Sequence, residues 1–206
     1  MTTSVTSLQR RLWTAAIIGA PLLLSIAQFF WQEGKVTTIA GTLQVLSFAL
    51  WVLAFQGMFN LIQKALPRYA VIGFALAVYA CIGGNNFGVD GIYGEAMGLK
   101  TLAEFNELHA KIGFPTAVIL FIPGTLFPLS MLLLGIQLVR TKRVSTLAGI
   151  LLCIGAACFP LSRIPRIDIL AHIDNVVLLM AHIVIALELS GSRKAIPSGQ
   201  NQAVIG

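Results

Sequence analysis

Charged residues are scarce in this chain, and that deficit excludes an ordinary water-soluble domain. Only 11% of its 206 residues are charged, whereas a soluble globular domain carries about 25%. Hydrophobic residues make up 57% of the chain, which leaves too little polar surface to cover a soluble globule. The composition therefore predicts an integral membrane protein whose main partner is the lipid bilayer.

Cysteine is also rare, and its placement argues against thiol redox chemistry and against zinc binding by cysteine. Cys81, Cys153 and Cys158 all lie in apolar runs, without C-x-x-C or zinc-type spacing. We expect them to pack as small hydrophobic side chains. The sequence also lacks H-E-x-x-H, and it has no nucleotide-binding or G-x-S-x-G motif in a suitable context. No motif indicates catalysis.

The net charge of +6 is not evidence for nucleic acid as a partner, because no basic run has interleaved aromatic residues. In a membrane protein such an excess is mainly a signal of orientation.

Six runs are long and apolar enough to cross a bilayer, which predicts an all-α, polytopic helical bundle. They cover about residues 12–31, 36–62, 69–84, 112–139, 144–161 and 167–189. Residues 1–11 form the predicted cytoplasmic N-terminal segment, and residues 190–206 a disordered cytoplasmic tail. A cleaved signal over residues 12–27 is the alternative for the first run. The length of the run and the anchor Trp31 favour a retained helix.

The longest polar segment, residues 85–111, precedes the fourth run. Its glycine-rich first part, NNFGVDGIYGEAMG, predicts a loop. Its second part, LKTLAEFNELHAKI, predicts an amphipathic helix with His109 on the apolar face. The fourth run contains Pro115, Pro123 and Pro128, which predict a kinked helix.

Lysine and arginine predict the orientation of the bundle in the membrane. One side collects nine of them: Arg10, Arg11, Lys64, Arg68, Arg140, Lys142, Arg143, Arg193 and Lys194. The other side has five: Lys35, Lys100, Lys111, Arg163 and Arg166. We therefore expect both termini in the cytoplasm, in a cytoplasmic (inner) membrane, with residues 85–111 and 163–166 facing outward.

The sixth run is apolar enough to span, yet it is rich in ionisable residues. Charged groups inside a membrane are costly and usually mark a functional path or site. At 100° per residue, Asp174 and Glu188 point away from a polar stripe about 80° wide. The stripe contains Asp168, His172, Asn175 and His182.

The predicted topology places His109 and His172 at comparable outer depths. An outer cluster of His109, Asp168 and His172 is then geometrically possible, and imidazole with carboxylate suits a metal ion such as zinc, iron or copper. A haem held by His109 and His172, or by His182 and another group, is a second possibility. His172 and His182 are ten residues apart, or about 15 Å along a helix, so they cannot share one metal ion.

We expect a non-enzymatic membrane protein that binds or passes a small ligand, ion or proton along the stripe of Asp168, His172, Asn175 and His182, with His109 nearby. One alternative is a membrane-embedded enzyme or redox subunit with an outward-facing metal or haem. Another is an accessory subunit, or a homo-oligomer, packed in a larger complex. The structural alternative is that these polar groups only join neighbouring helices.

Overall fold

The computed structural model describes residues 5–191, and it is almost entirely helical. Six helices are long and apolar enough to cross a membrane, which confirms the predicted all-α bundle. Five of them are α1 (Ser7–Gln28), α2 (Thr38–Ile62), α3 (Pro67–Ala96), α7 (Thr146–Arg163) and α8 (Asp168–Gly191). The fourth span in the chain, Phe114–Arg140, ends in α6 (Ile122–Arg140). The predicted tail from residue 192 onward lies outside the described residues.

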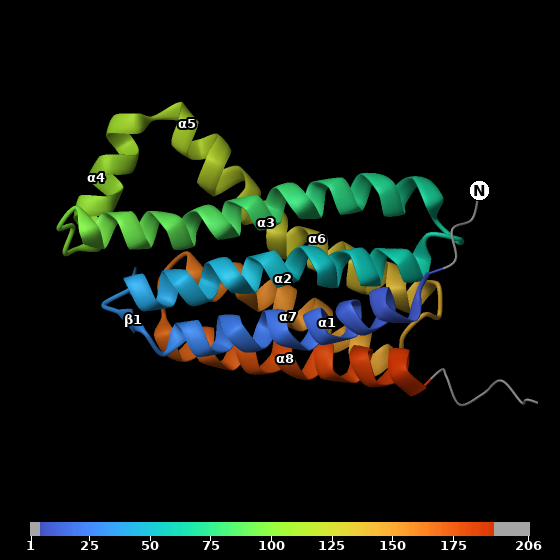
Figure 1. The fold of residues 1–206 in the computed structure, drawn as a ribbon. Coiled ribbons are helices and arrows are strands. Elements are labelled where there is room, and N and C mark those ends of the chain that lie inside the picture. The colour runs from blue at the N-terminus through green and yellow to red at the C-terminus, as the bar shows by residue number, and fades with distance from the viewer. Residues whose placement is uncertain (1–4, 192–206) are drawn as a thin grey trace, which may run out of the picture.

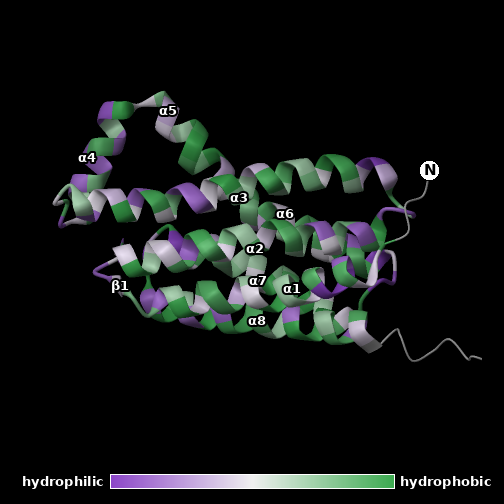
Figure 2. Ribbon diagram, in the orientation of Figure 1, coloured by the Kyte–Doolittle hydropathy of each residue, from purple (hydrophilic) through white to green (hydrophobic). Residues whose placement is uncertain are grey.

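The spans form a ring in which α1 packs on α2, α2 on α3, α3 on α6, α6 on α7, α7 on α8, and α8 back on α1 (Figure 1). Hydrophobic residues follow the lengths of the helices, and hydrophilic ones gather mostly toward the two ends (Figure 2). With this distribution, the fold is that of a multi-pass integral membrane protein.

The ends of the bundle differ. One, here called the hairpin end, holds a short antiparallel hairpin of β1 (Trp31–Gln32) and β2 (Lys35–Val36). Glu33 and Gly34 form its two-residue turn with φ of 51° and 75°, the left-handed conformation that such hairpins require. The α3–α4 connection and the α7–α8 link lie at the same end, whereas α1 begins and α8 ends at the other (Figure 1).

The loop predicted for the glycine-rich stretch is wrong, because α3 continues as a helix to Ala96. Gly84, Gly88, Gly91 and Gly94 are buried at helical spacing. A Cβ on Gly88 would lie 2.8 Å from the carbonyl oxygen of Gly41 in α2. Small residues let neighbouring backbones approach this closely in membranes, so the glycines form a packing face rather than a flexible segment.

The predicted amphipathic helix is present as α4 (Leu102–Ile112), which stands beside α3 at the hairpin end (Figure 1). It begins with a capping box, in which Glu104 N–H donates to Thr101 Oγ1 at 3.2 Å and Thr101 N–H donates to Glu104 Oε2 at 3.0 Å. Donation from the N–H groups of Lys100 and Thr101 holds the pKa of Glu104 below its usual value. Phe105 is buried against Gly94 and so ties α4 to α3.

The fourth span is interrupted, as its prolines predict. A short helix α5 (Phe114–Thr116) leads into a π-helix, η1 (Ala117–Phe121), before α6 begins. The N–H of Ile122 donates to Ala117 O, five residues earlier, in the π pattern.

Side chains of α3 support this interruption. Pro123 has no N–H to donate to Val118 O or Ile119 O, its partners in π and α geometry. Tyr79 Oη donates to Val118 O at 2.5 Å, and Asn86 Nδ2 donates to Ile119 O at 2.9 Å. Since lipid has no water to satisfy these carbonyls, the two α3 side chains take the place of the missing N–H.

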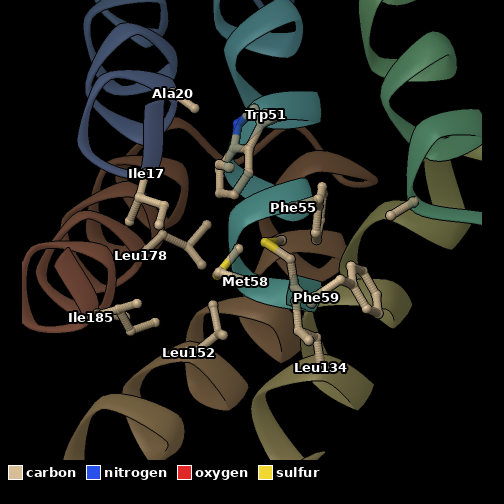
Figure 3. Packing of buried hydrophobic residues seen from close by; sticks show 14 of the residues in the cluster. Ile17, Ala20, Trp51, Phe55, Met58, Phe59, Leu134, Leu152, Leu178 and Ile185 are labelled. Carbon is tan, nitrogen blue, oxygen red and sulfur yellow. The ribbon is translucent and has the colours of Figure 1, made fainter. Parts of the chain in front are cut away.

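Bulky side chains fill the ring (Figure 3). Trp51, Phe55 and Met58 of α2 lie at its centre, with Ile17 of α1 and Leu178 of α8 beside them. Each of these side chains is at most 1% exposed. Around them the bundle is packed as a solid core.

We expect Tyr79→Phe to lower the free energy of unfolding by about 1–2 kcal/mol, because Val118 O loses its donor in a water-free setting. In a Pro123→Ala background, Tyr79→Phe is expected to lower the free energy of unfolding by less, because the alanine at position 123 supplies the N–H that proline lacks. Unfolding in detergent, followed by circular dichroism, measures all four proteins of this cycle. Tyr93→Phe is the control, since Tyr93 is 63% exposed on the same helix. If Tyr79→Phe lowers the free energy of unfolding equally in both backgrounds, the Tyr79 hydroxyl does not take the place of the N–H that is missing at Pro123.

Candidate functional site

A polar cluster lies inside the bundle at the hairpin end, centred on Arg163 at the last residue of α7. Arg163 Nη1 donates to Gln28 Oε1 of α1, and Nη2 donates to Asn175 Oδ1 of α8 at 2.7 Å. Gln28 is 3% exposed and Asn175 2% exposed. One guanidinium thus joins three helices through buried, charge-assisted hydrogen bonds.

Trp31, in the hairpin, lies beside this cluster and contacts two arginines. The Cζ atoms of Arg163 and Arg166 are 5.2 Å and 5.3 Å from its ring centroid, within cation–π distance. Arg166 Nη1 also donates to Gly34 O at 2.5 Å. Burial lowers the pKa of Arg166, and the nearby carboxylate of Asp90 raises it. The guanidinium remains charged, so both arginines are fixed cations.

Asp174 is the most unusual member of the cluster. It is 0% exposed, and neither carboxyl oxygen has a hydrogen-bond donor among the described residues. Arg163 interacts with it electrostatically, but no ion pair shorter than 4 Å joins them within residues 5–191. A buried carboxylate without donors is costly. This combination singles out Asp174 as the candidate functional group.

The predicted stripe on α8 needs a correction, because Asp174 belongs to the buried face and Asp168 does not. The buried face repeats at intervals of three and four residues: Ala171, Asp174, Leu178, Ala181 and Ile185. Asp168 is exposed and accepts a hydrogen bond from Gln28 Nε2 at 3.3 Å. His172 is half-buried, and the centroid of its ring is 4.6 Å from that of Phe29. Asn175 and His182 lie at one edge of the buried face. Helix packing thus buries the inner members of the polar stripe, Asn175 and His182, together with Asp174, and leaves Asp168 and His172 at the rim.

His182 lies deeper and away from the cluster. It is fully buried, and its Nδ1 is 2.6 Å from Leu178 O. Because a carbonyl only accepts, Nδ1 carries the proton and Nε2 is left as an acceptor without a partner among the described residues. The ring meets Trp51 edge-to-face at 4.8 Å, and Trp51 belongs to the buried hydrophobic core. His182 therefore packs against the aromatic core of the bundle.

His109 has a different partner from those predicted. Its Nε2 is 3.1 Å from Asp90 Oδ2 of α3. Figure 1 shows α4, which carries His109, on the opposite side of the bundle from α8, which carries Asp168 and His172. Within residues 5–191 no three His, Cys, Asp or Glu side chains form a group that could hold a metal ion. The predicted metal site of His109, Asp168 and His172 is therefore not assembled. Because His109 and His172 lie on opposite sides of the bundle, they also do not form the predicted pair of haem ligands.

The His109–Asp90 pair lines a small, partly open cavity of about 40 Å³ at the hairpin end. Lys35 and Arg166 supply cations to its wall, and Phe87, Phe105 and Phe121 supply aromatic rings. Sequence reasoning missed this site, since Asp90 lies in the stretch predicted as a loop. Helical spacing of the glycines on either side of Asp90 was the available signal.

We expect Arg163→Gln to lower the free energy of unfolding by roughly 2–5 kcal/mol, because two buried acceptors lose their donor and Asp174 loses its nearby cation. Arg140→Gln, the same charge change at an exposed site at the other end of the bundle, is expected to stay within about 0.5 kcal/mol of wild type. Denaturant unfolding in detergent measures both. Equal effects of the two substitutions would show that the cluster does not hold the helices together.

Comparison with protein-family models, with curated proteins and with solved structures finds no match to this chain.

Proposed function

We propose that the protein binds and releases a proton at the hairpin end of the bundle, and that this step serves the binding or passage of a small ligand. Asp174 is the proposed proton-binding group. The observation that carries the proposal is a fully buried carboxyl group whose two oxygens lack donors among the described residues. Intramembrane carboxyl groups commonly serve proton transfer in membrane proteins.

A proton suits the surroundings of Asp174 better than a larger ligand does. Asp174 does not line the cavity of about 40 Å³ that contains His109 and Asp90. A proton needs no such space, and it removes the charge that burial disfavours. Arg163, the charged group that acts on Asp174 electrostatically, favours the ionised form. In the proposed cycle the carboxyl group is neutral while Arg163 binds Gln28 and Asn175, and ionisation draws the guanidinium toward Asp174.

The rim of the cluster offers a route for the proton to reach water. Asp168 is exposed, His172 is half-buried and Asn175 is buried, so three members of the predicted stripe form a gradient from solvent to Asp174. We propose that the hairpin end faces outward. Among residues 5–191, seven lysines and arginines lie at the opposite end and five at the hairpin end, and the end with more of them is expected on the cytoplasmic side. The proton would then be exchanged with the outer side of the membrane.

Infrared spectroscopy of the purified protein tests Asp174 directly. Wild type is expected to show the C=O stretch of a protonated, buried carboxylic acid at neutral pH, and the band disappears as the pH is raised. Asp174→Asn lacks the band but keeps the fold, because asparagine is close in shape to the neutral acid.

Asp168→Asn is the matched control, about one and two-thirds turns away on the same helix. It is expected to keep the band, since Asp168 is exposed. A wild-type spectrum without the band, or a band that survives in Asp174→Asn, would end the proposal.

A further inference from the structure

The wall of the cavity beside α4 carries more cations than carboxylates. Lys35 and Arg166 line it together with one carboxylate, Asp90. Within residues 5–191 the ion pairs closer than 4 Å are His109–Asp90 and Lys111–Glu107. Neither cation of the cavity therefore has a carboxylate partner at that distance: Asp90 pairs with His109, and its charge acts on Arg166 only through space.

Two further carboxylates attract Lys35 from outside the cavity wall, and both are already engaged. Glu95 accepts a hydrogen bond from Thr38 N–H, and Glu104 accepts from the N–H groups of Lys100 and Thr101. Their charges act on Lys35 through space, without the close contact that would occupy its ammonium group.

The donors of the two cavity cations are largely unused. Gly34 O accepts one hydrogen bond from Arg166, whose guanidinium has five N–H donors. The Lys35 ammonium donates no hydrogen bond among the described residues. A planar guanidinium fits the two oxygens of a carboxylate or phosphate, and a neighbouring ammonium adds a point charge.

The walls of the cavity restrict what can enter. Phe105 and Phe121 pack around His109 with ring centroids 6.5 Å and 5.8 Å from the imidazole. The same rings line the cavity together with Lys35 and Arg166, and an apolar wall strengthens the attraction of a cation for an anion. At about 40 Å³ the cavity suits the charged group of a ligand, with the remainder in the open mouth.

We infer that this cavity is a binding site for a small oxyanion, a carboxylate or phosphate group, held by Lys35 and Arg166. The site is separate from Asp174 and does not depend on the proton-binding proposal. The same oxyanion chemistry is found in a free solute and in the headgroup of an anionic lipid. The two sources are distinguished by experiment.

Isothermal titration calorimetry of the full chain in neutral detergent, with inorganic phosphate and with acetate at constant ionic strength, tests the site. Arg166→Gln and Lys35→Gln are each expected to weaken binding at least about tenfold, the loss of a charge-assisted contact. Arg68→Gln and Lys64→Gln make the same changes at exposed positions at the other end of the bundle. They are expected to change affinity less than about twofold.

Nanodiscs identify the source of the oxyanion. If phosphate binds equally well in phosphatidylcholine and phosphatidylglycerol discs, the ligand is a free anion. If phosphatidylglycerol suppresses phosphate binding to wild type, the lipid headgroup occupies the site. Either result supports the inference.

Three results would overturn it: no binding of phosphate or acetate, together with no difference between the lipids; wild-type affinity in both cavity variants; or equal losses in the control variants. Circular dichroism establishes that each variant is folded. Should Arg166→Gln not fold, Lys35→Gln decides the question, because the Lys35 ammonium makes no hydrogen bond within residues 5–191 that its loss would break.

Discussion

The hydrogen bonds of Arg163 hold the bundle together where its first and last spans meet. The ring closes between α1 and α8, elements separated by most of the chain. Arg163 donates to Gln28 on one side of this seam and to Asn175 on the other. Hydrocarbon offers no water to replace such bonds, so the guanidinium must find its acceptors inside the protein. Its position also sets the electrostatic environment of Asp174.

The same requirement explains why α3 carries polar side chains at mid-length. Pro123 leaves two carbonyls without its N–H, and Tyr79 and Asn86 donate to them. The π-turn and these donors form one unit, since either without the other would leave polar groups unsatisfied in the membrane. On the N-terminal side of the interruption, α4 and α5 lie outside the ring (Figure 1), and His109 of α4 meets Asp90 of α3 in the cavity.

Hydropathy was sufficient to predict six spans, because a bilayer demands length and apolarity from every crossing helix, but it ended the third span at residue 84 although α3 continues to Ala96. The predicted topology put His109 and His172 toward the same end of the bundle, and α4 and the start of α8 both lie at the hairpin end (Figure 1). Depth does not specify position around the ring, and α4 stands beside α3 whereas α8 packs on α1 and α7. The candidate metal cluster failed for this reason. The prediction set Asp174 apart from the stripe, although the three-and-four spacing of Ala171, Leu178, Ala181 and Ile185 places Asp174 on the same buried side of the helix as Asn175 and His182.

Closure of the ring by its first and last spans has a consequence for biogenesis. During synthesis α1 leaves the ribosome before α7 and α8 have been made. Until then Gln28 lacks the Arg163 guanidinium that donates a hydrogen bond to it. The cluster assembles only after Arg163 and Asn175 have both been inserted. Burial of Asp174 therefore follows the insertion of α8, and a chain arrested before α8 would expose Gln28 to lipid without its donor.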